Sequence, residues 1–353
     1  YNKTEVPFLP NYLGRGFWPQ RTKNMKAQNT SLLYDQKQSA EFYEDRYEQG
    51  YMDEWPIEKK RKIFEVIQDI QLPAKGEALD FGCGNGVLTE IIRQGLPSWK
   101  IFGTDISNKA VSNARLSYPE CTFFEANSPD FTQKKFDFIF TNHVFEHVYN
   151  LTEVFNQMNE YLKPKSSMLH FLPCGNEGSY EYNICMLRKD GINAEHENTF
   201  FFEDEGHVRR LTTDELCGLC RTKDFVLQKE FYSNQYDGAI DWITNSYLSN
   251  PFFVLKFSDP SQAINKHAKR ELKKVRIYLI IITALRLPSQ IVTKLLRKRN
   301  KHLKHYILLL IGLPFFIFSS PIDKYWKSKA REEWNTMKHA PNGSEMTLYF
   351  KRS

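Results

Sequence analysis

The feature that most constrains the fold of this chain is a short apolar segment that leads into three closely spaced glycines. Residues 77–81 are expected to form a β-strand, and residues 87–92 have the apolar spacing of a helix that packs on one face. Between them, glycines occupy positions 82, 84 and 86, where a side chain would hinder a tight turn and a close approach to a ligand. A strand, a glycine loop and a helix in this order are typical of the start of a nucleotide-binding βαβ unit.

The spacing of the glycines separates two classes of nucleotide-binding protein. Dinucleotide-binding enzymes use Gly-x-Gly-x-x-Gly, whereas this chain has Gly82-x-Gly84-x-Gly86, with Asp80 two residues before the first glycine. This pattern resembles motif I of the class I S-adenosylmethionine (SAM) dependent methyltransferases. The resemblance implies SAM as the cofactor, S-adenosylhomocysteine (SAH) as the product, and cofactor contacts from Asp80, Gly82, Cys83, Gly84 and Gly86.

A carboxylate follows at the distance that a nucleotide cofactor requires. Residues 99–106 are expected to form the second strand, in which Asp105 lies nineteen residues beyond Gly86. A carboxylate at this strand end can accept hydrogen bonds from both ribose hydroxyls, and its charge suits the cationic sulfonium of SAM. We therefore predict that Asp105 and the adjacent Ile106 belong to the cofactor site.

The end of the third expected strand adds the predicted adenine contacts. Residues 121–126 are expected to form this strand. In the resembled family, an acidic side chain and a neighbouring backbone amide at this strand end contact the adenine amino group. The matched positions are Glu125 and Ala126, and many family members have Asp where this chain has Glu125.

The segment after the fourth expected strand, residues 136–141, contains the groups that could face the reaction. Residues 142–148 read NHVFEHV, which resembles the corresponding segment of methyltransferases that modify ubiquinone and sugars. In those proteins the segment lies beside the methionine end of the cofactor. The match implies that Asn142 belongs to the cofactor site.

Three histidines are candidate catalytic residues. His143, Glu146 and His147 are spaced i, i+3 and i+4, which places them on one face if the segment is helical. That face could hold a general base or a divalent metal ion, or the residues could only cap and pack the turn, with Glu146 paired to a nearby base. His207 lies just before a predicted helix that Thr212 or Thr213 would cap, in a segment similar to one in sugar-modifying members of the family. We predict His147, His143 and His207 as catalytic residues, in that order, and assign no metal ligands.

The order of the expected elements predicts an α/β fold. Five strands that alternate with helices, the fifth at 167–173, require a parallel sheet with right-handed crossovers. The resemblance adds a sixth strand at 225–232 and a last strand at 344–352, paired antiparallel. We therefore predict a Rossmann-like, seven-stranded methyltransferase sheet that is parallel with an antiparallel last strand, and a basic, apolar helical insertion before that strand.

The same pattern predicts four parts of the chain. Residues 1–38 are polar and rich in turn-forming residues, and are predicted to form an N-terminal arm. Residues 39–232 are predicted to form the SAM-binding core, in which 174–206 breaks the periodicity and is expected to face the substrate. The insertion is predicted at 233–343, and residues 344–353 return to the core as its final strand.

Charge within the insertion is uneven in a way that indicates a partner. Residues 265–305 contain thirteen Lys or Arg and one acidic residue, a charge of +12, whereas the whole chain carries only +6. The uncharged run at 306–319 has fourteen residues, fewer than the ~20 that span a bilayer. Basic residues beside apolar helices predict association with an anionic membrane surface, with a structural helical cap or a dimer surface as the alternative. Nucleic-acid binding is not expected, because a phosphate-binding surface does not need the apolar run.

Cysteine usage indicates the compartment. The six cysteines lack the spacing of a disulfide framework, which favours a reducing environment. We therefore predict a cytoplasmic protein that is peripheral or monotopic at the inner face of the cell membrane.

These observations lead to one functional prediction and two alternatives. The prediction is a SAM-dependent methyltransferase that methylates an oxygen of a lipid-linked glycan, a polysaccharide or another membrane-anchored acceptor. One alternative retains the cofactor and takes a lipid or quinone-type small molecule as acceptor. The other is a membrane-bound scaffold that has the methyltransferase fold and no catalytic activity.

Overall fold

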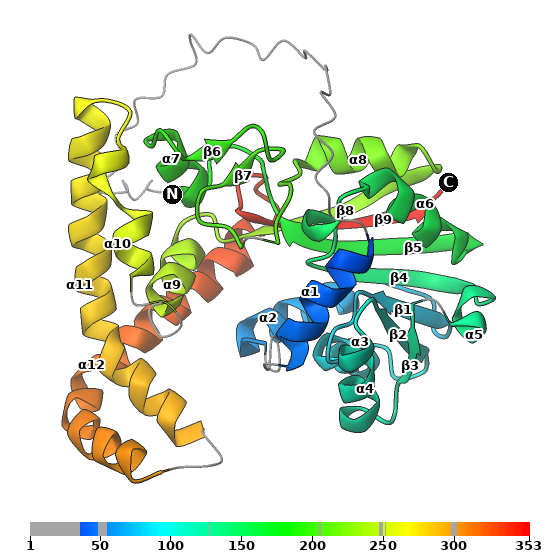
Figure 1. Cartoon of the computed structure of the whole chain (residues 1–353), viewed down its shortest axis with the longest axis horizontal. Helices are drawn as coiled ribbons and strands as arrows, with labels where there is room; N and C mark the ends of the chain where they lie inside the picture. The colour runs from blue at the N-terminus through cyan, green and yellow to red at the C-terminus, as the bar shows by residue number, and fades with distance from the viewer. Residues whose placement is uncertain are drawn as a thin grey trace. The chain divides into compact units, whose positions relative to one another are not determined.

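The computed structural model describes residues 36–48, 55–126, 128–204, 206–246, 250, 252–297 and 302–353, and it contains a seven-stranded sheet (Figure 1). The strand order is β3-β2-β1-β4-β5-β9-β8. The strands are β1 (Glu77–Phe81), β2 (Lys100–Asp105), β3 (Thr122–Glu125), β4 (Phe136–Asn142), β5 (Leu162–Pro173), β8 (Phe225–Ser233) and β9 (Glu345–Arg352). Strands β1 to β5 pair parallel, and β9 pairs antiparallel with both β5 and β8. The predicted fold is confirmed.

The two faces of the sheet bury alternate residues of each strand. On β1, Ala78 packs into one hydrophobic cluster and Leu79 into the other, because successive side chains of a strand point to opposite faces. On β4, Phe138 belongs to the cluster of Ala78, and Ile139 belongs to that of Leu79. Both faces are therefore covered, as expected for a sheet whose central strands are parallel.

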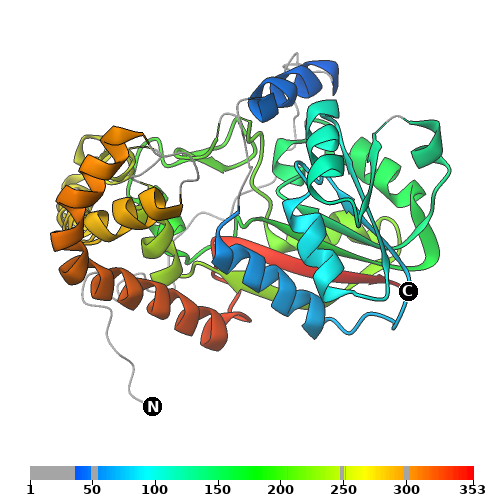
Figure 2. The same ribbon diagram turned by 90° about the horizontal axis from the view of Figure 1, so that it is seen from below.

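Helices cover the sheet on both sides (Figures 1 and 2). Helices α2 (Ile57–Asp69), α3 (Val87–Gly95) and α4 (Asn108–Ser117) contribute to the cluster of Ala78. Helices α5 (Pro129–Thr132), α6 (Leu151–Glu160) and α8 (Thr213–Arg221) contribute to the cluster of Leu79. The predicted cap of α8 is Thr212, whose hydroxyl accepts from the Glu215 amide, while the Glu215 carboxylate accepts from the Thr212 amide.

Strand β5 begins five residues earlier than the sequence predicted. Phe136 of β4 pairs with Leu162, and Phe138 pairs with Ser167, so the register shifts between these two pairs. Pro164 has no amide hydrogen to donate, and prolines in sheets are found at such irregular positions. In the shifted stretch, Lys163 pairs with Asp137 at 2.8 Å and with Glu77 at 3.2 Å.

The chain forms two compact units. One contains the sheet, within 34–183, 192–239 and 329–353, and it includes helix α1 (Gln36–Glu48). Its segment between β5 and α8 carries a hairpin of β6 (Ile192–Asn193) and β7 (Thr199–Phe200), and α7 (Tyr180–Met186) crosses into the second unit. The predicted N-terminal arm lies outside the described residues, apart from positions 36–38 in α1.

The second unit is helical and contains residues 184–191 and 240–328. Its helices are α9 (Asp237–Asn245), which begins in the first unit, α10 (Phe253–Phe257), α11 (Lys266–Arg297) and α12 (Leu303–Met337), which ends in the first unit. These helices lie between β8 and β9 in the sequence, so the predicted helical insertion before the last strand is confirmed.

A buried arginine joins three helices of this second unit. The Arg286 side chain of α11 is fully buried. Its guanidinium donates to Asp241 and Thr244 of α9 at 2.5 and 2.6 Å, and to Asp323 of α12 at 2.8 Å. Asp241, which is partly buried, and Asp323, which is buried and also pairs with Lys327, therefore share this guanidinium as a compensating charge.

Replacement of this arginine should destabilise the second unit. Arg286→Met removes the buried cation that Asp241 and Asp323 share, which leaves only Lys327 paired with Asp323, and should lower the free energy of unfolding by about 3 to 5 kcal/mol. Urea denaturation of the full chain measures this change. Lys269→Met is the control, because Lys269 is exposed on the same helix and its replacement should change the free energy of unfolding by no more than about 0.5 kcal/mol. Equal effects of the two substitutions would contradict the interpretation, and adding Asp241→Asn and Asp323→Asn should restore much of the loss.

Candidate active site

A cavity of about 520 Å³ opens at the carboxyl ends of the central parallel strands. Open α/β sheets bind their ligands at this edge. The predicted site residues that line the cavity are Asp80, Gly82, Cys83, Gly84, Asp105, Ile106, Ala126, Asn142, His143 and His147. Residues at the ends of four different strands, β1 to β4, therefore meet in one place.

The glycine loop brings the backbone close to the cavity wall. Gly84 has a φ of +51°, and a Cβ at this position would lie 2.6 Å from the Tyr47 hydroxyl oxygen. The Gly84 amide donates to the Asp105 carboxylate at 2.8 Å, which joins the loop after β1 to the end of β2. Gly86, also predicted to contact the cofactor, does not line the cavity, and it packs instead against α4 and β3 where α3 begins.

Asp105 is buried at the cavity wall with both carboxylate oxygens oriented by the backbone. One oxygen accepts from the Gly84 amide, and the other accepts from the Ser107 amide at 2.9 Å. Burial raises the pKa of the Asp105 carboxyl, although these backbone hydrogen bonds act in the opposite direction. Each oxygen keeps a lone pair that can accept a hydrogen bond from a ligand.

Asp80 is the second carboxylate of the cavity wall. The Thr89 hydroxyl of α3 donates to it at 2.6 Å. Burial raises the pKa of Asp80 to about 7, against the effect of the Thr89 hydrogen bond, and the nearby Asp105 raises it further. Two neighbouring carboxylates in a buried wall favour a cationic ligand.

Of the two residues predicted to contact the adenine at the end of β3, Ala126 lines the cavity and Glu125 does not. Ala126 and Ile106 line the cavity together with Phe131 of α5. Glu125 is about half exposed, lies outside the cavity lining and pairs with Arg115 at 3.7 Å. Phe131 was not predicted as a site residue, because it belongs to none of the motifs recognised in the sequence.

The segment after β4 is not the helical face that the spacing suggested. His143 has a φ of +55°, in the left-handed region, and only Phe145–His147 form a turn of 3-10 helix. Asn142 lines the cavity, and both side-chain polar atoms of Asn142 are buried without a hydrogen-bond partner within the described structure. Buried amide atoms of this kind usually have partners, so a ligand is the group that would satisfy them.

His143 lies in a buried network of charged groups. Its Nδ1 is 2.6 Å from Glu146, and its Nε2 is 3.4 Å from both Lys59 of α2 and Glu345 of β9. Lys59 and Glu345 also pair directly. Burial lowers the pKa of His143, but the Glu146 carboxylate and the hydrogen bond with Glu345 together outweigh burial, so the pKa is raised. Burial raises the pKa of Glu146, but the attraction and hydrogen bond of His143, together with the nearby His147 and His207, outweigh it, so the pKa falls to about 2.

His147 and His207 meet beside the cavity. His147 donates from Nδ1 to the Gly206 carbonyl oxygen at 3.0 Å, and its ring lies edge-on to that of His207 with centroids 4.6 Å apart. Burial lowers the pKa of His147, and the Glu146 carboxylate only partly offsets this. His207 does not line the cavity, and its Nδ1 donates to Glu203 at 2.9 Å. One potential ligand atom from each of Glu146, His147 and His207 lies within 4.8 Å of the others.

Helix α1 closes part of the cavity and is joined to two other segments. Its Tyr43 and Tyr47 line the cavity, as does Trp55, which stacks on His143. Glu44 accepts from the Ser107 hydroxyl at 2.5 Å and from the Lys109 amide at 3.1 Å, so it caps α4. Arg46 forms two hydrogen bonds with Asp204, at 2.8 and 2.9 Å.

One whole side of the cavity was not predicted from the sequence. It is formed by α6 and the residues that flank it at both ends: Tyr149, Asn150, Glu153, Val154, Gln157 and Tyr161. These residues follow the 142–148 segment directly. Their position in the chain was the only signal that could have identified them.

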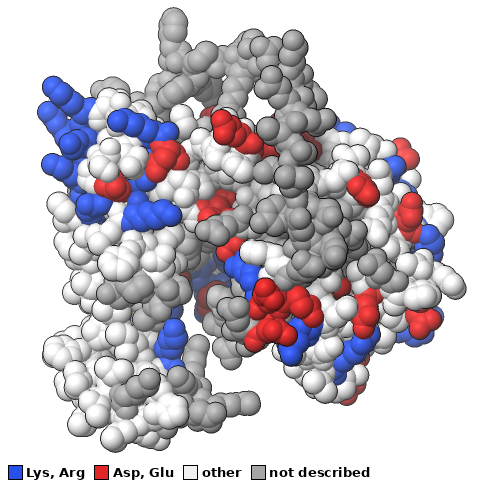
Figure 3. Space-filling view, viewed as in Figure 1, with Lys and Arg blue, Asp and Glu red and all other residues white. Residues whose placement is uncertain are grey.

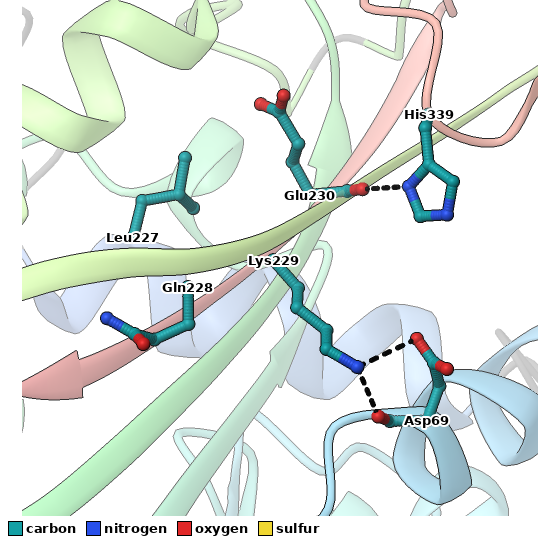
Figure 4. Close-up of a pocket in the computed structure, with 6 residues that line it drawn as sticks. All are labelled: Asp69, Leu227, Gln228, Lys229, Glu230 and His339. Carbon is teal, nitrogen blue, oxygen red and sulfur yellow. Dashed lines mark hydrogen bonds and ion pairs between the residues drawn. The ribbon is translucent and has the colours of Figure 1, made fainter.

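A second hollow, beside the edge strand β8, is a weaker candidate. Its Lys229 donates to the Asp69 carbonyl oxygen at 2.5 Å, and His339 donates to the Glu230 carbonyl oxygen at 2.9 Å (Figure 4). These polar groups bond to each other rather than converge on a common point. The cavity at the strand ends is therefore the candidate active site.

The raised pKa of Asp80 makes a prediction about stability. The folded protein keeps a proton on Asp80 up to about pH 7, whereas the unfolded chain releases it near pH 3.8. The free energy of unfolding should therefore fall as pH rises between these values, by about 2 kcal/mol from about pH 5 to about pH 7 for this one group. Denaturant unfolding without cofactor should show this dependence in the wild type and in Asp130→Asn, an exposed carboxyl control, but not in Asp80→Asn. Identical pH dependence in wild type and Asp80→Asn would mean that Asp80 is already ionised in the folded protein at the lower pH.

Comparison with known proteins agrees with this geometry. The model of a family described as a methyltransferase domain matches residues 52–230, just over half of the chain. Trans-aconitate 2-methyltransferase from Escherichia coli O157:H7 is 27% identical over 117 residues, which cover 33% of this chain and 46% of the relative. The same enzyme from Shigella flexneri matches with the same identity and coverage. The chain therefore spans about half the length of these curated relatives.

Solved structures with a similar arrangement include two methyltransferases. A TehB-like SAM-dependent methyltransferase from Corynebacterium glutamicum has a TM-score of 0.36 and 15% identity, over 54% of this chain and 86% of that chain. A putative sarcosine dimethylglycine methyltransferase from Galdieria sulphuraria has a TM-score of 0.42 and 12% identity, over 84% of both chains. The family match, the seven-stranded sheet and the glycine loop agree, and this chain belongs to the class I SAM-dependent methyltransferases.

Proposed function

We propose that this protein transfers the methyl group of SAM to an oxygen atom of its acceptor. The observation that carries the proposal is the cavity at the strand ends. The glycine loop, Asp105 and His147 all line this cavity. SAM supplies a methyl group on a positively charged sulfur, which an oxygen nucleophile can attack in line. The protein's task is to hold the acceptor oxygen and the methyl group in that alignment.

The residues of the cavity fit this cofactor. The unpaired amide of Asn142 has room for ligand partners, and Gly84 lets the backbone approach without a side chain between. We propose that Asp105 binds the ribose hydroxyls of SAM, and that the adenine ring contacts Ile106, Ala126 and Phe131. A cationic cofactor beside Asp80 would favour the ionised form of this carboxyl, whose pKa is raised to about 7, and the carboxylate would then balance the cofactor's charge.

His147 is the catalytic residue that the geometry favours among the three predicted histidines. Because a carbonyl oxygen can only accept, the Gly206 contact places a proton on Nδ1 and leaves the lone pair of neutral His147 on Nε2. That nitrogen can accept a hydrogen bond from an acceptor hydroxyl and take its proton. His143 has both ring nitrogens within its buried network, so we assign it to positioning Glu146, and His207 contacts the site through His147.

We also propose that the acceptor is presented at a membrane, as a lipid-linked glycan or a similar anchored molecule. In α12, apolar side chains are exposed over a broad face of the helix: Tyr306, Ile307, Leu308, Leu310, Ile311, Leu313, Phe315, Ile317 and Phe318. The remaining side of this stretch carries the buried His305 and Ser319, and Gly312, which lies close to Val292 of α11. A broad exposed apolar face is normally covered by another protein or by a membrane. The helix continues through Pro314 and Pro321, so neither proline ends it.

Helix α11 supports the same proposal from its charge. Lys and Arg side chains gather over its N-terminal half, whereas the first half of α12 shows almost no charge (Figure 3). By length and composition alone, 266–296 and 305–337 could each cross a membrane, which is weak evidence of spanning. Basic side chains next to exposed apolar ones favour an anionic lipid surface.

His147 can be tested by substitution. His147→Ala should lower the rate of methyl transfer by about 100-fold or more, because the acceptor loses its base and its hydrogen-bond partner. SAM affinity, measured by calorimetry, should change by less than about 3-fold, since the binding contacts lie elsewhere in the cavity. Transfer is followed with methyl-labelled SAM and lipid or glycan extracts. His339→Ala serves as the matched control, and unchanged transfer in His147→Ala would remove this residue from the mechanism.

Membrane association can be tested with exposed residues of α12. Replacing Leu310, Phe315 and Phe318 by Ser should weaken flotation with anionic liposomes more than 10-fold, because each buried apolar side chain contributes about 1.5 to 3 kcal/mol. Leu116→Ser, an exposed leucine of α4, is the control. A wild-type protein that does not float, or a triple variant that floats as well as the wild type, would contradict the proposal.

A further inference from the structure

We propose that Glu146, His147 and His207 bind a divalent transition-metal cation, such as Zn²⁺ or Mn²⁺, beside the cofactor cavity. The inference deepens the proposed methyl transfer and rests on it, because the cation would lie where the acceptor oxygen is activated. Two imidazoles and one carboxylate are a ligand set that suits such cations better than Mg²⁺ or Ca²⁺, which prefer oxygen ligands.

The three side chains already form a compact cluster. One ligand atom from each lies within 4.8 Å of the others, and the rings of His147 and His207 are nearly perpendicular. The backbone maintains this arrangement, because the Val208 amide donates to the Glu146 carbonyl oxygen at 2.8 Å. The segment that carries His207 is thereby fixed against the turn that carries Glu146 and His147.

An unpaired carboxylate oxygen shows what the cluster lacks. Glu146 is almost completely buried, and one of its oxygens is 2.6 Å from His143. Its other oxygen, Oε2, is buried without a hydrogen-bond partner within the described structure. A buried carboxylate oxygen with no partner is costly, and a cation would satisfy it.

Both histidines have a hydrogen bond that would orient them as ligands. His147 donates from Nδ1 to the Gly206 carbonyl oxygen, and His207 donates from Nδ1 to Glu203. Arg210 pairs with Glu203 and fixes that carboxylate in turn. Metal-binding histidines nearly always donate their second ring nitrogen to a carbonyl or a carboxylate, which leaves Nε2 for the metal.

The position of the cluster gives the cation a role. His147 lines the cavity, so a cation bound to it can also take the acceptor hydroxyl as a ligand. A metal ion lowers the pKa of a bound hydroxyl, so the proton leaves to water and the oxygen becomes the nucleophile. The O–C bond then forms as the S–C bond of SAM breaks, and SAH is the leaving group. With the cation bound, the lone pair of His147 binds the metal ion and no longer accepts a proton. The metal ion then activates the acceptor hydroxyl in place of His147.

Metal binding can be measured without any acceptor. The full chain is stripped with EDTA and titrated by calorimetry with Zn²⁺ or Mn²⁺, with Mg²⁺ for comparison. We expect one equivalent of Zn²⁺ or Mn²⁺ to bind, and His207→Ala should weaken binding at least 10-fold. SAM binding to His207→Ala should stay within about 3-fold of the wild type, because His207 does not line the cavity. His339→Ala is the control, and Glu203→Gln should weaken binding less than His207→Ala does.

The outcomes separate this inference from the proposed function. Equal binding of Zn²⁺ and Mn²⁺ by wild type and His207→Ala, or no bound equivalent in the wild type, would overturn the metal site. If the metal site is overturned and methyl transfer still proceeds unchanged in EDTA, the proposed methyl transfer holds without a metal ion. A bound equivalent that His207→Ala loses supports the metal site, even if no acceptor is methylated.

Discussion

Parallel pairing of β1 with β2 and with β4 decides where the polar groups of the site lie. The register sets Asp80 of β1 opposite Gly103 of β2 and Phe140 of β4, so the three strands end at the same edge. The glycine loop, Asp105 and Asn142 therefore meet although they belong to different parts of the sequence. The hydrogen bond from the Gly84 amide to Asp105 then connects two of these strand ends directly.

Residues that depend on this pairing could be predicted from the sequence. Asp80, Asp105 and Asn142 lie at or near strand ends that local patterns reveal, and the topology of a parallel sheet brings them together. Strand ends do not determine side-chain direction, however. Ala126 lines the cavity while Glu125, one residue earlier, turns toward Arg115, because successive side chains of a strand point to opposite faces.

Contacts that depend on distant parts of the chain could not be predicted. Lys59 and Glu345 are separated by 286 residues and meet beside His143 only because β9 pairs with β5 in one register. The helical spacing of His143, Glu146 and His147 was also misleading, because the backbone of His143 is left-handed. The meeting of His147 with His207 depends on a loop whose course follows no periodic pattern.

Glu345 has a particular place in the chain, because it is the first residue of β9 after the helical insertion. It pairs with Pro173 at the end of β5. A slip of one residue in this pairing would turn the Glu345 side chain to the other face of the sheet, away from both Lys59 and His143. The register in which the chain re-enters the sheet after the insertion is therefore coupled to the charge balance beside the active site.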